Sequence, residues 1–144
     1  MTSEQMVLNL DMAPTLLQMA GLPVPSGMQG KSMLPLAEGQ EIAWRQDWLY
    51  EYYEYPGFEN VRPCRGVRTT RYKYIEFFLD PKEYELYDLE KDPDEMYNLY
   101  GKPGYEKLTR HLQARMEELR KETNDHYHYQ PTGMPLYPAP FKQK

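Results

Sequence analysis

The chain has 144 residues, with 17 basic and 22 acidic side chains and a formal net charge of −5. This length is near the commonest domain size and predicts a core of moderate extent. The acidic balance argues against a nucleic-acid-binding protein, which would normally carry a basic excess. A single cysteine, Cys64, excludes an intrachain disulfide and a cysteine-based zinc site. The high counts of tyrosine (14) and proline (13) predict aromatic sheet surfaces and many loops.

The sequence carries no recognisable targeting signal. No stretch approaches the roughly 18 consecutive apolar residues of a membrane span, and the N-terminus lacks the basic-then-apolar pattern of a signal peptide. We therefore expect either a cytoplasmic protein or a piece of a larger one.

A short helix is predicted over residues 11–20. Asp11 suits its N-cap, because the carboxylate could accept hydrogen bonds from the free N–H groups of the first turn. Apolar residues occupy most sides of this helix, as is typical of a helix buried in a larger body. Residues 22–47 follow as a loop longer than compact domains usually hold. We expect both segments to be poorly covered in the isolated chain, so that residues 1–45 are cut first in limited proteolysis.

Strand-like patterns begin at residue 48. The aromatic-rich segment 48–55 and the alternating segment 66–79 are predicted strands, and 84–87 returns from the second of them as a hairpin. Asp80 and Pro81 stand in the hairpin turn. A turn that leads into a short helical segment is predicted over residues 88–98.

An amphipathic helix is predicted over residues 105–123. Its apolar stripe recurs at helical spacing and consists of Tyr105, Leu108, Leu112, Met116 and Leu119. The sequence therefore predicts an α+β fold, in which a small antiparallel sheet packs against this helix. Residues 125–144 are expected to form an extended tail.

Arginines surround the only thiol. Arg62, Arg65 and Arg68 flank Cys64, and such a cluster would lower the thiol pKa and suit an anionic ligand such as sulfate, phosphate or carboxylate. The alternative is that the arginines pair with the excess carboxylates of the chain. A thiol enzyme would also need a histidine, His111 or His126, within hydrogen-bond reach of the sulfur.

Two patterns resemble metal sites only in part. The carboxylates of residues 88–94 alternate like the start of an EF-hand loop, but Pro93 stands where that loop needs glycine. His126 and His128 could form half of a metal site, although a polar tail is the favoured interpretation. We expect no self-sufficient active site and no cofactor in this chain.

Several motifs in order resemble the type I sulfatases, closest to the N-acetylglucosamine-6-sulfatase-like and arylsulfatase enzymes that act on sulfated glycans. They are, in chain order, Asp11–Gly21, Met28–Ser32, Gly66–Ile75, Glu85–Leu89 and Asp92–Leu99. The first two resemble the end of the catalytic domain, and the others resemble strands and a turn of the C-terminal subdomain. The resemblance covers about residues 7–120.

This resemblance implies that residues 1–45 close the catalytic domain and that residues 46–124 form the C-terminal subdomain. The family uses calcium and a formylglycine made from Cys or Ser in a C/S-x-P-x-R motif, and both lie upstream of the region matched here. Cys64 is not that residue, because Gly66 stands in place of the proline.

The resemblance further implies that the parent protein hydrolyses sulfate esters and is periplasmic, secreted or lysosomal. The chain alone is expected to be inactive and to need the missing N-terminal catalytic domain as its partner. It would complete the fold and one wall of the substrate pocket. Arg62 and Arg65 are the candidate substrate contacts, with Cys64 as a third, although relatives commonly have histidine near this position.

The alternative function is a stand-alone glycan-binding or protein-interaction module that uses its tyrosines and arginines. The helix at 11–20 separates the two interpretations, because a stand-alone module must bury it.

Overall fold

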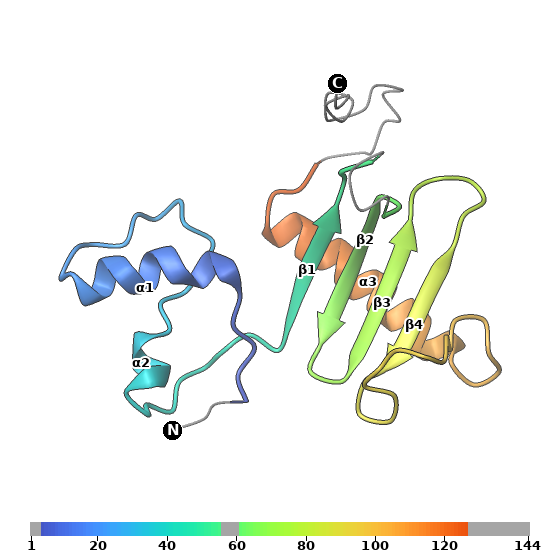
Figure 1. Ribbon diagram of the computed structural model, residues 1–144, viewed down its shortest axis with the longest axis horizontal. Coiled ribbons are helices and arrows are strands. Elements are labelled where there is room, and N and C mark those ends of the chain that lie inside the picture. The colour runs from blue at the N-terminus through green and yellow to red at the C-terminus, as the bar shows by residue number, and fades with distance from the viewer. Residues whose placement is uncertain (1–3, 56–60, 127–144) are drawn as a thin grey trace, which may run out of the picture. The chain divides into compact units, whose positions relative to one another are not determined.

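A computed structural model of the chain describes residues 4–55 and 61–126. The chain divides into two compact units, which we call unit 1 (Met1–Gln46) and unit 2 (Asp47–Lys144) (Figure 1). Residues 127–144, which contain most of the predicted tail and His128, lie outside the described residues.

Unit 2 is built on a four-stranded antiparallel sheet. Its strands are β1 (Asp47–Tyr52), β2 (Cys64–Thr69), β3 (Tyr72–Phe77) and β4 (Tyr84–Asp88), and they lie side by side in chain order. The helix α3 (Glu106–Glu122) crosses one face of this sheet (Figure 1). The predicted α+β fold, with a sheet packed against a C-terminal helix, is confirmed.

The core of unit 2 lies between the sheet and α3. One row of directly paired side chains crosses all four strands: Leu49, Val67, Tyr74 and Leu86. The helix contributes three buried side chains that confirm the predicted stripe: Leu112, Met116 and Leu119. Because residues alternate between faces along a strand, this row also fixes which side chains point away from α3.

The prediction of one long strand over residues 66–79 is wrong. Two strands stand there, separated by a tight turn at Thr70 and Arg71. The turn contains no Gly or Pro; instead, Thr69 Oγ1 accepts hydrogen bonds from the N–H groups of Arg71 (3.3 Å) and Tyr72 (2.8 Å). A threonine hydroxyl that replaces a backbone acceptor leaves the apolar alternation intact, so the pattern alone does not reveal the turn.

The predicted helical segment in 88–98 is also wrong, since the chain there makes consecutive turns. The Asp92 carboxylate accepts from the N–H groups of Met96 (3.0 Å) and Tyr97 (2.8 Å). Glu95 adopts a left-handed φ of 57°, and its carboxylate lies 2.6 Å from Lys73 Nζ. A left-handed residue interrupts a right-handed helix, so the segment turns back toward the sheet.

Asn98 then closes the free edge of β4. Its Oδ1 accepts from the N–H of Leu86 (3.1 Å) and its Nδ2 donates to the carbonyl of Tyr84 (2.9 Å). The Leu99 N–H adds a backbone bond of 2.8 Å to Leu86 O. These bonds satisfy backbone groups that an edge strand would otherwise expose.

Unit 1 contains a 3₁₀ turn (Asn9–Asp11), the helix α1 (Met12–Met19) and one short helix, α2 (Leu34–Ala37). The predicted helix at 11–20 is confirmed. The predicted loop at 22–47 also contains α2. This helix has only four residues, too few for a helical periodicity to show in the sequence.

Unit 1 is held by a buried carboxylate. Asp11 is fully buried, and its oxygens accept from the N–H groups of Leu8 and Lys31 (both 2.8 Å) and from the Arg45 guanidinium, which contacts both oxygens (Nη2 to Oδ1, 2.7 Å). The predicted capping of the following helix is wrong, because the Asp11 side chain makes no cap bond to α1. Its carboxylate instead joins three segments far apart in the sequence.

Close backbone packing supports this set of contacts around the Asp11 carboxylate, which we call the hub. A Cβ atom on Gly30 would overlap the Leu10 carbonyl, so only glycine lets the long loop pass beside the turn. Trp44 Nε1 donates to the Met6 carbonyl at 2.7 Å. Trp44 is buried, but no apolar cluster comparable to the core of unit 2 forms in the described part of unit 1.

The hub makes unit 1 sensitive to acid. Burial by itself raises the pKa of Asp11, but Arg45 and the N–H groups of Lys31 and Leu8 outweigh it, so the pKa lies below its ordinary 3.8. This carboxylate therefore stabilises the fold above that pH, and its contribution is lost as the pH falls through 3.8 and below.

We expect Trp44 fluorescence, read in a Trp48→Phe background, to report the loss of unit 1 structure below about pH 4. Asp11→Asn should lower the free energy of unfolding of unit 1 at pH 7 by about 1–3 kcal/mol and flatten this acid transition. Glu41→Gln, an exposed carboxylate of the same unit, is the control. An acid transition that Asp11→Asn leaves in place would contradict the role of the hub.

Candidate functional site

Three segments of unit 2 meet at one end of the sheet. Strand pairing places Tyr52, Cys64 and Phe77 side by side, so the β1–β2 connection (53–63) and the β3–β4 turn (78–83) leave the sheet at the same end. The Phe78 N–H donates to the Pro63 carbonyl at 3.0 Å, and the Tyr53 and Phe78 rings stack with their centroids 5.9 Å apart. We call the described parts of these segments, residues 53–55, 61–63 and 78–83, the loop end of the sheet.

Arg62 binds one loop to the other. Its Nη2 donates to the carbonyls of Leu79 (2.7 Å) and Pro81 (2.8 Å), and its Nη1 lies 2.6 Å from a Glu83 carboxylate oxygen. The guanidinium also stacks over the Phe77 ring, 5.5 Å from its centroid. About a quarter of the Arg62 side chain remains exposed, so the loop end presents a cation to solvent.

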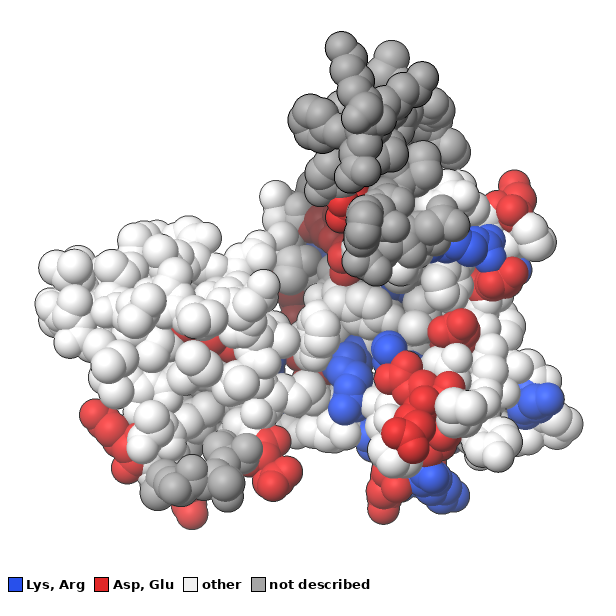
Figure 2. Space-filling model, viewed as in Figure 1, with Lys and Arg blue, Asp and Glu red and all other residues white. Residues whose placement is uncertain are grey.

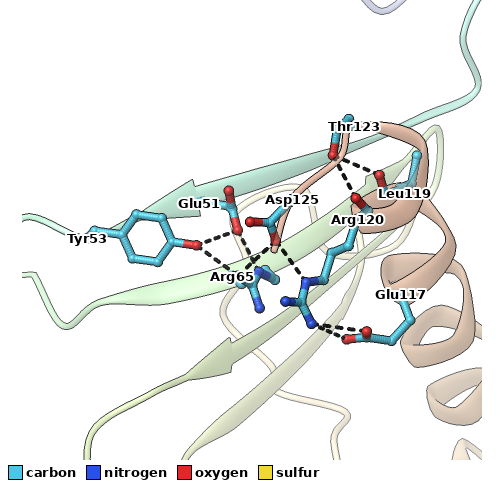
Figure 3. A network of polar contacts seen from close by, with 8 residues as sticks. All are labelled: Glu51, Tyr53, Arg65, Glu117, Leu119, Arg120, Thr123 and Asp125. Carbon is cyan, nitrogen blue, oxygen red and sulfur yellow. Dashed lines mark hydrogen bonds and ion pairs between the residues drawn. The ribbon is translucent and has the colours of Figure 1, made fainter. Parts of the chain in front are cut away.

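Arg65 lies deeper, on the face of the sheet that α3 covers. Its Nε donates to Glu51 (2.6 Å), and its Nη2 contacts the Tyr53 hydroxyl (2.9 Å) and Asp125 (3.0 Å) (Figure 3). Burial alone would lower the pKa of Arg65, but the bonds to Glu51 and Tyr53 raise it. A buried cation with this many partners is held in one position.

Asp125 connects this cation to the end of α3. Its carboxylate accepts from Arg120 Nε at 2.8 Å, and Arg120 also contacts Glu117 at 3.0 Å (Figure 3). Asn124 has a φ of 57°, and the Asp125 N–H donates to the Arg120 carbonyl at 2.7 Å, which is a left-handed helix ending. The helix ending thus places a carboxylate between two arginines from different elements.

Cys64 occupies the opposite face of the sheet from Arg65. Burial raises the pKa of its thiol, Glu85 raises it further, and Lys73 acts in the other direction. The expectation that the surrounding arginines lower this pKa is wrong, because Arg65 points to the opposite face of the sheet and the raising effect of burial exceeds the lowering effect of Lys73. The geometry also excludes the thiol-enzyme interpretation through His111, since α3 covers the other face of the sheet.

The remaining histidine and the alternating carboxylates make other contacts. The His126 ring lies 2.9 Å from Asn124 Oδ1. Asp88, the first carboxylate of the EF-hand-like run, forms a two-pronged pair with Arg71 at 2.9 and 2.7 Å. That pairing lowers the pKa of Asp88, against the opposing effect of burial.

No three His, Cys, Asp or Glu side chains come close enough to hold a metal ion within residues 4–55 and 61–126. The calcium implied by the resemblance therefore has no ligand set in this part of the chain. Over the same residues, no helix is long and apolar enough to cross a membrane.

The order of these elements matches known proteins. Residues 1–122 match the family described as N-sulphoglucosamine sulphohydrolase, C-terminal. The chain belongs to this family. The predicted resemblance to sulfatases is thereby confirmed, and the match ends three residues before Asp125.

The relatives are longer sulfatases. An N-acetylglucosamine-6-O-sulfatase from Bacteroides thetaiotaomicron is 41% identical over 86% of this chain and 23% of that protein. A Delta 4,5-hexuronate-2-O-sulfatase from the same organism is 34% identical over 82% of this chain and 24% of that protein. The chain thus spans about a quarter of the length of these relatives.

A solved structure shows the same fold with a ligand. It is described as a complex with its substrate D-glucosamine-2-N,6-O-disulfate, and it is 41% identical with a TM-score of 0.75. The similarity covers 81% of this chain and 24% of that one. The α+β unit described here is therefore the fold of a sulfatase C-terminal region.

The contacts of the three predicted site residues are now defined, but their role toward a substrate stays a prediction. Arg62 lies at the end of the β1–β2 connection and Arg65 lies in β2, and both side chains bind other groups of the chain. Sequence reasoning missed Glu51, which stands directly opposite Arg65 in the register. It also missed Asp125, whose position depends on the left-handed helix ending.

Replacing Asp125 tests how firmly the helix ending holds the loop end. We expect Asp125→Asn to lower the free energy of unfolding by about 1–3 kcal/mol, because it removes a charge shared by two mostly buried arginines. Glu118→Gln, a surface carboxylate of α3, should change it by less than about 0.5 kcal/mol. Urea denaturation measures both, and equal effects would count against the network.

Alkylation tests the state of the thiol. Since burial raises the pKa of Cys64, we expect iodoacetamide at pH 7.5 to react at least about tenfold more slowly with the folded chain than with the urea-unfolded chain. A folded chain that reacts faster than the unfolded one would restore the activated-thiol interpretation.

Proposed function

We propose that this chain is the C-terminal portion of a sulfatase that hydrolyses sulfate esters of sulfated carbohydrates. The observation that carries the proposal is the family match, which runs through both units in order while spanning about a quarter of the relatives. The catalytic domain of the same enzyme would be the partner of this chain. The formylglycine and the calcium ion would belong to that domain.

The substrate class follows from the relatives. The most similar curated protein described above is named an N-acetylglucosamine-6-O-sulfatase, and the similar solved structure is described with a disulfated glucosamine. A 6-O-sulfated glucosamine is therefore the substrate that we propose for the whole enzyme. Residues 1–45 would close its catalytic domain, and residues 46–124 would form its C-terminal subdomain.

The loop end would contribute to the pocket wall. Arg62 is partly exposed there, and a guanidinium suits the sulfate or hydroxyl groups of a sulfated sugar. Arg65 has its partners within unit 2, so its role would be to hold the connection that carries Arg62. Cys64 lies among buried groups on the other face, and any contact with a sugar would be indirect.

The alternative, a stand-alone glycan-binding or protein-interaction module, requires the helix at 11–20 to be buried. Met12, Leu16 and Met19 of α1 are all exposed. This exposure favours the sulfatase interpretation, because an isolated binding module gains nothing from an uncovered apolar helix.

A chimeric enzyme tests the proposal. The C-terminal quarter of the Bacteroides thetaiotaomicron N-acetylglucosamine-6-O-sulfatase would be replaced by this chain, and hydrolysis of N-acetylglucosamine-6-sulfate would be measured. We expect the chimera to be active and the 144-residue chain alone to be inactive. An active isolated chain, or a folded chimera without activity, would contradict the proposal.

Within that chimera, Arg62→Ala should raise KM about tenfold or more while changing kcat less, because the substitution removes a sugar contact distant from the reacting bond. Arg110→Ala, an exposed arginine on α3, is the matched control and should leave both constants unchanged. An unchanged KM in Arg62→Ala would remove Arg62 from the pocket wall.

A further inference from the structure

Exposed apolar side chains are concentrated in unit 1. Twelve large apolar side chains are exposed among the described residues, and nine of them lie between Val7 and Ile42. Unit 1 holds only a third of the sequence, so this distribution is strongly uneven. Isolated exposed apolar residues are ordinary, whereas a contiguous group of them marks an interaction surface.

The central members of this group form a stripe on α1. Met12, Leu16 and Met19 recur at i, i+4 and i+7, which places them on one side of the helix. Their exposed fractions are 58%, 62% and 65%. The helix carries no charged residue, and Figure 2 shows an almost entirely uncharged surface over α1.

Polar contacts on another side of the helix fix this orientation. Thr15 Oγ1 donates to the Asp11 carbonyl at 2.6 Å and accepts from the Met33 N–H at 2.8 Å. The Asp11 carboxylate, just before the helix, is bound by Arg45 and Lys31. The inward side of α1 therefore carries the buried Pro14 and the hydrogen-bonded Thr15, whereas the apolar stripe stays exposed.

We propose that the stripe of Met12, Leu16 and Met19, continued by exposed Leu22, is the surface by which this chain docks onto the upstream portion of a sulfatase. The inference rests on the proposed function and adds the residues that make the contact. The hub around Asp11 presents this surface in a preformed state, so docking does not require the segment to fold first.

The length of the relatives indicates which protein segment covers the stripe. They contain a similar segment, 34–41% identical to this chain, that forms 23–24% of their length, so about three quarters of each protein lies outside it. An uncharged apolar helix face is typical of permanent contacts, which resemble a domain core, rather than of transient polar ones. A second copy of this chain is the competing occupant.

A pairwise binding experiment tests the surface. The partner is the Bacteroides thetaiotaomicron N-acetylglucosamine-6-O-sulfatase without the segment matched by this chain, co-expressed with the full 144-residue chain. We expect a one-to-one complex by size-exclusion chromatography with light scattering. Leu16→Asp with Met19→Asp should weaken it about tenfold or more, because charge is placed in an apolar contact.

Gln18→Asp is the control, since it adds one negative charge on another side of α1 and should leave binding unchanged. The double substitution should also leave the melting temperature of the isolated chain unchanged, because the stripe is exposed there. A complex that survives the double substitution would overturn the proposal. So would a dimer of the isolated chain that the same substitution dissociates.

The chimera provides a second measurement where the shortened partner does not fold. The double substitution should lower its melting temperature, and Gln18→Asp should not; equal melting temperatures would overturn the docking surface. Activity is read separately. A chimera that melts as expected but does not hydrolyse the sulfate ester contradicts the proposed function and leaves the docking surface standing.

Discussion

Pairs between arginines and carboxylates hold the elements of both units together, and only in unit 2 does a clustered apolar core accompany them. In unit 1 the pair is Asp11 with Arg45, and in unit 2 the Arg65–Asp125 and Arg115–Asp47 pairs tie α3 or its end to the sheet. The planar guanidinium can bind both oxygens of a carboxylate, as Arg115 does with Asp47 at 2.6 and 2.9 Å. Each pair fixes a direction as well as a distance, which apolar contacts alone do not.

The two units differ in how much else supports these pairs. Unit 2 has a core in which a row of side chains across four strands meets three from α3. Unit 1 reverses this arrangement, with a charged centre and apolar residues outside. The same type of interaction therefore reinforces a complete fold in unit 2, whereas in unit 1 it organises a segment that exposes its apolar side chains.

The sequence predicted the features that depend on periodicity. The stripe from Tyr105 to Leu119 and the aromatic strands identified the helix and the sheet, because each pattern extends over many residues. Features that depend on a few local side-chain hydrogen bonds were missed. The turn at Thr69 interrupts the predicted strand, and the bend at Glu95 stands where a short helix was predicted. Local contacts of this kind leave no repeating pattern in the sequence.

The site shows the same division. The clustering of Arg62 and Arg65 near Cys64 was visible in the sequence, but strand geometry sends Arg65 and Cys64 to opposite faces. Their partners lie far along the chain: Arg62 contacts Glu83, and Arg65 contacts Asp125. Such pairs require the register of the sheet and the ending of α3, and neither is encoded in a local motif.

The order of the elements along the chain has a consequence for synthesis. The four strands form a simple meander, so each can pair with its predecessor as soon as it is made. The side chains that cover the sheet come last, on α3, after the turns of residues 89–105. A nascent chain therefore displays the apolar row from Leu49 to Leu86 until α3 is complete. Exposed apolar surface of this kind promotes aggregation, so the completion of α3 also ends the most aggregation-prone stage of the synthesis of unit 2.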